Sequence, residues 1–161
     1  MERSQNQLFH IVEDQESICE FMVELLTATG YQAIGFSNPL KYIHHIENET
    51  DVPPAAIFTD IMMPGMSGYE LIDKVREKFP DQRIVAISGF TGDTELNEKG
   101  TCHFLTKPFS PNKFIDIAEA LLQCENAGYS TTIPICEALK EDDAPDCPPL
   151  NCIGCQQMHR S

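Results

Sequence analysis

Five polar side chains in this sequence have the chemistry of a phosphoryl-transfer site. Each stands at the end of a short apolar run, and they are Glu13, Asp14, Asp60, Ser88 and Lys107. Neighbouring carboxylates repel one another unless a cation joins them, and Mg²⁺ prefers such oxygen ligands. An aspartate can attack phosphorus to give an acyl phosphate, while an ammonium group and a hydroxyl hold the phosphoryl oxygens. The set therefore indicates phosphoryl transfer to a carboxylate beside Mg²⁺.

Short apolar runs alternate with helical patterns through most of the chain. Strand-like runs occupy 8–12, 31–36, 55–59, 83–87 and 103–106, and helical spacing fills the segments between them and after Pro111. The helical stretch near 93–99 is weak. Five strand–helix units in strict alternation predict an α/β fold, a doubly wound five-stranded parallel sheet with helices on both faces. Ligands of such sheets bind beyond the carboxyl ends of the strands, where the five polar residues fall.

Four motifs resemble those of response-regulator receiver domains. They are Val-Glu-Asp at 12–14, Thr-Asp-Ile-Met-Met-Pro-Gly-Met-Ser-Gly at 59–68, Ala-Ile-Ser-Gly at 86–89 and Phe-Leu-Thr-Lys-Pro-Phe at 104–109. All four in this order are far more specific than any one alone. The resemblance implies a flavodoxin-like fold for a receiver domain at 7–124. It also implies a regulatory phosphoacceptor of two-component signalling rather than an enzyme, with only self-catalysed phosphorylation and slow autodephosphorylation.

The resemblance assigns the metal site and the acceptor. Asp60 would accept the phosphoryl group from a phosphohistidine, so a histidine kinase or a phosphotransfer protein would be the donor. Mg²⁺ would be held by Glu13, Asp14, Asp60 and the backbone carbonyl of Met62.

The resemblance also assigns a clamp and a switch. Lys107 and Ser88 would hold phosphoryl oxygens, and Phe104 matches the aromatic residue that couples phosphorylation to the partner-binding surface. As in the family, a cis peptide bond is expected between Lys107 and Pro108.

Two features depart from the usual family pattern. Glu13 stands where aspartate is more common, a variant that should still bind metal. Only 18 residues separate Ser88 from Lys107, fewer than is usual. We therefore expect a shortened fourth helix and an altered surface for partner recognition, with unchanged phosphorylation chemistry.

Residues 125–161 form an acidic tail that contains proline and cysteine, and we expect it to be disordered or tethered by a metal. Cys147, Cys152, Cys155 and His159 have spacings found in zinc sites. The three cysteines also match part of a plant-type iron–sulfur ligand set, which needs a fourth cysteine. Incidental thiols remain a third interpretation. The alternative function is accordingly a metal- or redox-sensing protein that uses the receiver fold as a scaffold.

A third class, a hydrolase of related α/β fold class that uses an aspartate nucleophile, is disfavoured. Such enzymes generally need an acid/base aspartate two residues beyond the nucleophile, and position 62 is methionine.

The charge balance restricts the partners. The formal net charge is −14, with 11 Lys and Arg against 25 Asp and Glu, which argues against a nucleic-acid surface. The apolar runs are too short to cross a membrane, and the first seven residues lack a secretory signal. We expect a cytoplasmic protein whose downstream target is another protein.

The histidines show no catalytic pattern. His10 lies within the first apolar run, where a core position is expected. His44 and His45 have no evident carboxylate or thiol partner, and we expect this pair to face solvent.

Overall fold

The computed structural model describes residues 8–49, 52–80, 82–89 and 103–126. The strands are β1 (Leu8–Val12), β2 (Gln32–Phe36), β3 (Ala56–Asp60), β4 (Ile84–Ser88) and β5 (His103–Thr106). The helices are α1 (Glu16–Ala28), α2 (Pro39–Asn48), α3 (Gly68–Lys78) and α5 (Pro111–Asn126). The expected helical stretch near 93–99, and with it the shortened fourth helix, lies outside the described residues.

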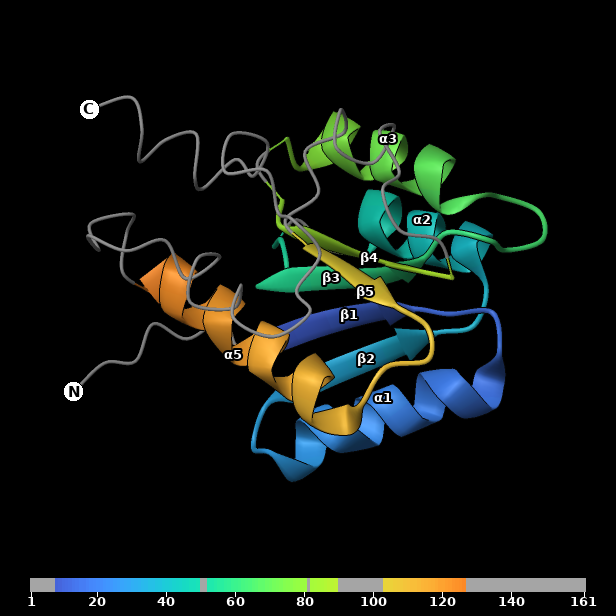
Figure 1. Ribbon diagram of the computed structural model, residues 1–161. Helices are drawn as coiled ribbons and strands as arrows, with labels where there is room; N and C mark the ends of the chain where they lie inside the picture. The colour runs from blue at the N-terminus through green and yellow to red at the C-terminus, as the bar shows by residue number, and fades with distance from the viewer. Residues whose placement is uncertain (1–7, 50–51, 81, 90–102, 127–161) are drawn as a thin grey trace.

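All strand pairs are parallel, and the sheet has the order β2-β1-β3-β4-β5. Helices α1 and α5 cover one face of the sheet, and α2 and α3 cover the other (Figure 1). The predicted doubly wound parallel sheet is therefore confirmed. Among the described helices, none has the length and apolarity needed to cross a bilayer.

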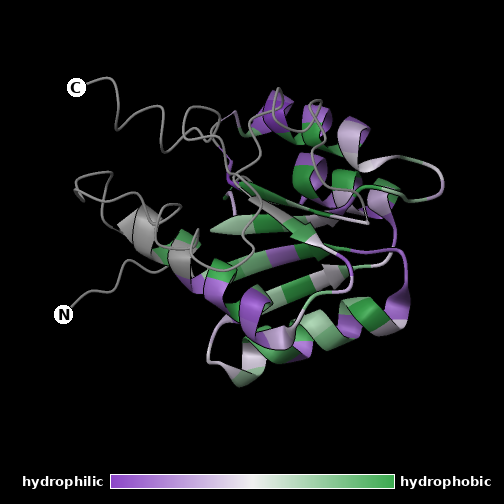
Figure 2. Cartoon of the chain, viewed as in Figure 1, coloured by the Kyte–Doolittle hydropathy of each residue, from purple (hydrophilic) through white to green (hydrophobic). Residues whose placement is uncertain are grey.

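The burial of each strand follows its place in the sheet. All residues of β3 and β4 are buried, as expected for central strands covered on both faces. The edge strand β2 has exposed residues, with Ile34 40% exposed. Buried apolar residues of the strands and helices form two cores, one on each face of the sheet. The strands are largely hydrophobic in the hydropathy colouring of Figure 2, and each helix carries both hydrophobic and hydrophilic residues.

Short polar side chains mark where three helices begin. The Asn38 side chain accepts hydrogen bonds from the backbone N–H groups of Leu40 and Lys41 at the start of α2. Ser67 and Ser110 cap α3 and α5 in the same way. These caps satisfy N–H groups that have no partner within the helix. Helix α5 continues to Asn126, past the predicted boundary at residue 124, and the division into domain and tail stays a prediction.

Gly68 permits the tight return of the chain after β3. A Cβ atom at this position would lie 2.5 Å from the carbonyl oxygen of Asp60 and 2.7 Å from the Cα of Ile61. The Gly68 N–H donates to the Ile61 carbonyl at 2.8 Å. Because backbone atoms cannot move aside as a flexible side chain can, glycine keeps the start of α3 against the end of β3.

His10 lies in the core, as predicted, but the prediction for His45 was wrong. His10 is 1% exposed, and its Nδ1 is 2.9 Å from the hydroxyl of Tyr42. The side chain of His45 is only 22% exposed, and its Nδ1 lies 2.6 Å from a carboxylate oxygen of Glu49. The spacing of four residues between His45 and Glu49, within reach on one helical face, was the signal for this contact.

We expect acid to weaken the fold through His10. Burial, and then the nearby His45, lower the pKa of His10 from 6.5 to about 4. Between these values the unfolded chain binds a proton that the folded chain excludes, so stability falls as the pH falls from about 6.5 to about 4. The full loss is about 3 kcal/mol for a shift of this size.

Urea unfolding followed by circular dichroism between pH 7 and pH 4.5 measures this effect against His10→Gln, which keeps a polar partner for Tyr42. The variant should lose less stability over that interval. Equal pH slopes for the two proteins would contradict this role of His10.

Candidate functional site

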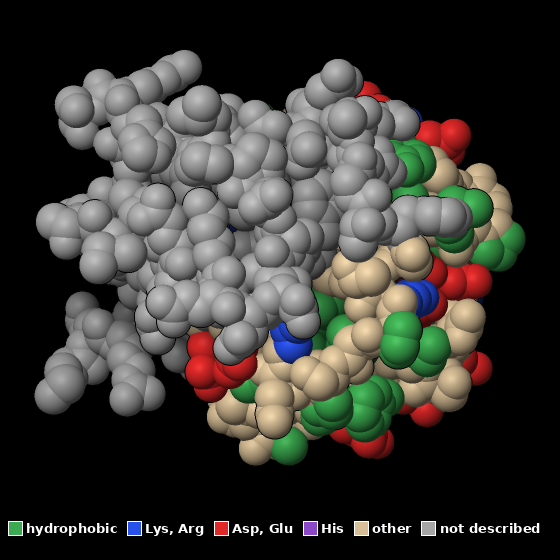
Figure 3. Space-filling model, in the orientation of Figure 1, with side chains coloured by type: hydrophobic (Ala, Val, Ile, Leu, Met, Phe, Trp, Pro, Cys, Tyr) green, Lys and Arg blue, Asp and Glu red, His purple; other side chains and the backbone are tan. Residues whose placement is uncertain are grey.

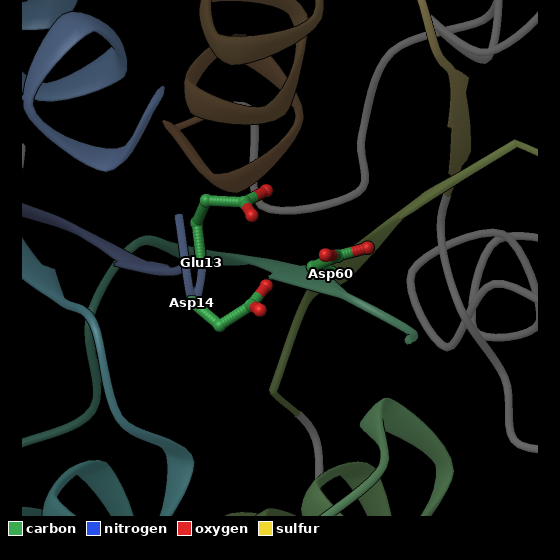
Figure 4. Close-up of side chains that lie close together, drawn as sticks. All are labelled: Glu13, Asp14 and Asp60. Carbon is green, nitrogen blue, oxygen red and sulfur yellow. The ribbon is translucent and has the colours of Figure 1, made fainter. Parts of the chain in front are cut away.

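Three carboxylates meet beyond the carboxyl ends of two neighbouring strands. Glu13 and Asp14 follow β1, and Asp60 is the last residue of β3. Figure 4 shows their side chains gathered in one region, and each offers an oxygen within 4.8 Å of the others. Parallel pairing of β1 with β3 brings these strand ends together, as predicted from the sequence.

Lys107 supplies the positive charge at this cluster. Its Nζ donates to a carboxylate oxygen of Glu13 at 3.1 Å and to one of Asp60 at 3.3 Å. The backbone N–H of Lys107 donates to the Ser88 carbonyl at 2.9 Å, which continues the pairing of β4 with β5. The peptide bond between Lys107 and Pro108 is cis, as predicted.

The buried position of the cluster changes its proton affinities. Glu13 is fully buried, and this burial, with the Asp60 carboxylate, raises its pKa to about 7 despite the hydrogen bond from Lys107. For Lys107, burial favours the neutral form, but attraction to Glu13 and Asp60 outweighs burial and raises its pKa. Lys107 therefore stays charged at neutral pH and balances part of the negative charge.

Asp60 is held in a fixed orientation. It is 5% exposed, its Oδ1 accepts a hydrogen bond from the Ile61 N–H at 2.8 Å, and its Oδ2 faces Lys107. The backbone N–H of Gln15 similarly donates to a Glu13 oxygen at 3.2 Å. The side-chain pattern gave no signal for these two backbone donors, because they depend on the local path of the chain after each strand.

The donor set fits a divalent cation with oxygen preference. Mg²⁺ is bound in proteins through a few carboxylates, with waters and phosphate oxygens as its other ligands. Glu13 and Asp60 are buried, whereas Asp14 is half-buried at the edge of the cluster. The cluster therefore has the composition of a magnesium site.

Three further residues of the predicted site lie in or just after β3, β4 and β5. Ser88 ends β4 and is 3% exposed, and Phe104 lies in β5 opposite Ala86. The Met62 side chain is 68% exposed just after β3. The cysteine and histidine set Cys147, Cys152, Cys155 and His159 lies outside the described residues.

Asp14→Asn should make the metal-free protein more stable and weaken its metal binding. Removing one of three clustered negative charges relieves repulsion, so the free energy of unfolding should rise by about 1 kcal/mol in EDTA. Mg²⁺ affinity should fall by at least about tenfold because a ligand is lost. Urea unfolding and titration calorimetry measure the two effects.

Asp116→Asn, at an exposed position on α5, is the matched control. A destabilised Asp14→Asn variant in EDTA would count against the repulsive cluster.

A comparison with protein-family models identifies the class to which this fold and site belong. Residues 9–119 match the family described as the response regulator receiver domain. The chain therefore belongs to the response regulator receiver family, and it is a phosphoacceptor regulatory module.

Individual relatives agree with this assignment. The chain is 29% identical over 115 residues to the response regulator receiver protein CpdR of Brucella abortus, a match that covers 70% of this chain and 93% of the relative. It is 27% identical over 117 residues to the transcriptional regulatory protein CssR of Bacillus subtilis, with 71% of this chain and 50% of the relative covered. The match therefore spans 93% of the first relative but only half of the second.

Solved structures show the same fold. A CheY-like receiver domain protein from Methanospirillum hungatei superposes with a TM-score of 0.68 at 21% identity, covering 77% of this chain and 98% of that one. The beryllofluoride-activated NtrC4 receiver domain, a dimer, gives a TM-score of 0.65 at 27% identity, covering 74% of this chain and 98% of that one. Membership of this family implies a histidine kinase as the phosphoryl donor.

Proposed function

We propose that Asp60 accepts a phosphoryl group from a phosphohistidine of a histidine kinase or a phosphotransfer protein. The observation that carries the proposal is the meeting of three carboxylates and Lys107 at one end of the sheet. Asp60 is the member of the cluster that ends a central strand and contacts Lys107 directly. Glu13, Asp14, Asp60 and the Met62 carbonyl would hold Mg²⁺.

In the transfer step, a carboxylate oxygen of Asp60 forms a bond to phosphorus as the bond between phosphorus and the histidine nitrogen breaks. The electron pair leaves with the imidazole, and the product is an acyl phosphate. Lys107 and the Ser88 hydroxyl would hold the phosphoryl oxygens. Bound Mg²⁺ would neutralise charge on the phosphoryl group and align it with the carboxylate.

The charge of the protein explains why a cation is needed. Acidic side chains are spread around the described part of the surface in Figure 3, with fewer basic ones between them, and the formal net charge is −14. A phosphate donor approaching this surface meets repulsion that Lys107 alone does not offset. Mg²⁺ held by the acidic cluster would add two positive charges where the phosphoryl group arrives.

The response to phosphorylation would be carried by protein contacts. Phe104, in β5, would couple the phosphorylated site to a surface that binds a downstream protein, and we assign neither nucleic acid nor membrane to this surface. The proposed location is the cytoplasm, where a kinase would deliver the phosphoryl group.

Transfer from a purified phosphorylated donor tests the proposal. We expect the phosphohistidine label to move to this chain with Mg²⁺ and to stay on the donor with EDTA. Alkali should then release the label, because acyl phosphates hydrolyse in base. Transfer that is equally fast in EDTA would contradict the assigned metal site.

The tail requires a separate measurement. The spacing of Cys147, Cys152, Cys155 and His159 supports a zinc site, and with it the alternative metal- or redox-sensing function. Elemental analysis and a visible spectrum of the full-length protein distinguish zinc, an iron–sulfur cluster and unligated thiols. Bound metal that is lost from Cys152→Ser would support the tail site, whereas absence of metal would exclude it.

A further inference from the structure

A recess of about 260 Å³ lies at the amino-terminal edge of the sheet, where β3 and β4 begin. This edge is opposite the strand ends that carry the acidic cluster. The recess has an apolar wall and polar side chains, which include Lys78 and Gln82. The apolar wall includes Pro53, Pro54, Phe79 and Pro80, and we call these four residues together with Lys78 and Gln82 the amino-edge recess.

Gln82 lines this recess and has an unused hydrogen-bond acceptor. The residue is 5% exposed, and its Nε2 donates to the carbonyls of Pro54 at 3.0 Å and Arg83 at 3.1 Å. These two bonds fix which end of the amide is nitrogen. Its Oε1 is buried without a hydrogen-bond partner in the described part of the chain. A buried acceptor without a donor is costly, so a ligand with an N–H group would be favoured here.

Lys78 gives the recess a preference for an anionic ligand. Its ammonium group donates to the Ile46 carbonyl and lies 5.6 Å from the centre of the Phe79 ring. These contacts hold the charge at the recess, and Arg83 adds a second cation to its lining. A carboxylate with an adjacent peptide N–H matches this combination, because it meets the cations and supplies the donor that the Gln82 oxygen lacks.

We propose that the amino-edge recess binds the acidic run Glu141-Asp142-Asp143 of the same chain. Helix α5 ends at Asn126 at this amino-terminal edge of the sheet (Figure 1). The 14 residues 127–140 connect it to the acidic run, and a chain of that length has a root-mean-square span of roughly 20 Å. Because the acidic run is tethered to the domain, its local concentration at the recess is about millimolar. A separate acidic protein would not reach that concentration, since this protein is acidic overall and would repel it.

Charge complementarity favours this segment over other parts of the chain. The segment 74–83 contains four of the 11 basic residues of the chain against two acidic ones, Glu77 and Asp81, and so carries a net positive charge; the basic residues are Lys74, Arg76, Lys78 and Arg83. The run 141–143 is the only place in the sequence where three acidic residues are consecutive. Docking would tie the segment after α5 to the turn between α3 and β4, on the side of the sheet away from Asp60.

Carbodiimide crosslinking of the full-length protein tests the proposal. This reagent joins an amine and a carboxylate in direct contact through an amide bond, with loss of water. We expect a crosslink from Lys78 to Glu141, Asp142 or Asp143, located by mass spectrometry of a digest. Lys74, exposed on α3 and outside the recess, is the internal control and should give no such crosslink.

The triple variant Glu141→Gln, Asp142→Asn, Asp143→Asn should lose the crosslink and shift the NMR signal of the Gln82 side-chain amide. The double variant Glu137→Gln, Asp146→Asn changes flanking acidic residues instead. It should keep the crosslink and the wild-type NMR signal of the Gln82 side-chain amide. All five positions follow Asn126, the last residue of α5, and circular dichroism of each variant checks that the fold is unchanged.

Mixing isotopically labelled and unlabelled protein before crosslinking identifies the source of the segment. Crosslinked peptides of a single isotopic origin support binding within one chain. Mixed peptides would assign the recess to the acidic run of a second copy and overturn the proposal. Absence of any crosslink at Lys78, or an unchanged Gln82 signal in the triple variant, would overturn it as well.

Discussion

Asp60→Asn should abolish phosphorylation of this protein by a small acyl-phosphate donor in the presence of Mg²⁺. The amide that replaces the carboxylate is a very poor nucleophile, so the acyl phosphate has no atom on which to form. The wild-type protein should gain a single phosphoryl group, observed by intact-protein mass spectrometry. The substitution also removes a negative charge from the cluster, so it should not unfold the domain.

Asp116→Asn is the control for this experiment, because Asp116 is an exposed carboxylate of α5 far along the chain from the cluster. It should be phosphorylated like the wild type. A phosphoryl group on the Asp60→Asn variant would move the acceptor to another residue, and Asp14 would then be the first to test.

Lys107→Ala should slow phosphorylation by about 10²-fold to 10³-fold, the usual cost of removing one group that stabilises developing charge in a closed site. The same change should destabilise the metal-free protein by about 2 kcal/mol, since Glu13 and Asp60 lose their shared cation. Glu13 limits this loss, because its raised pKa allows it to take up a proton. Rates with the acyl-phosphate donor and urea unfolding in EDTA measure the two effects.

Lys107→Arg and Lys74→Ala are the matched controls. Arginine keeps the charge but has a planar, larger head group, so we expect it to restore stability more than rate. Lys74, exposed on α3, should be replaceable without effect on either quantity. A Lys107→Ala variant that is phosphorylated at the wild-type rate would remove Lys107 from the transfer step.

These two predictions rest on one electrostatic arrangement. Among the described residues Lys107 is the cation that contacts both Glu13 and Asp60, and it follows β5, the strand on the far side of β4. Mg²⁺ would share this role when it binds. Binding should therefore stabilise the fold by about 2.7 kcal/mol when Mg²⁺ is at 100 times its dissociation constant.

Most of the fold follows from local patterns in the sequence. The bounds of β1 and β5 agree with the predicted ranges. Strand β2 begins one residue later than predicted, and β3 and β4 are each shifted by one residue at both ends. Apolar runs of strand length, caps such as Asn38 and Ser67, and the alternation of strands with helices are local signals. The parallel sheet follows from them because each helix returns the chain to the starting edge.

The identity of the cluster could also be predicted, but its electrostatics could not. The motifs single out Glu13, Asp14, Asp60 and Lys107 in sequence. The contact of Lys107 with both Glu13 and Asp60, and the raised pKa of Glu13, depend on burial and on distances of 3.1 to 3.3 Å between residues far apart in the chain. The contact between His45 and Glu49 was missed although its spacing was visible.

The sequence by itself therefore determined the class of protein, the order of the elements and the residues at the strand ends, because these depend on local periodicity and on motifs. Only the tertiary structure decided how the charges are paired, and that a recess with Gln82 and Lys78 lies at the opposite edge of the sheet. The reason is physical: pairing energies and pKa values depend on separation and solvent exposure, and both are set only when distant segments pack together.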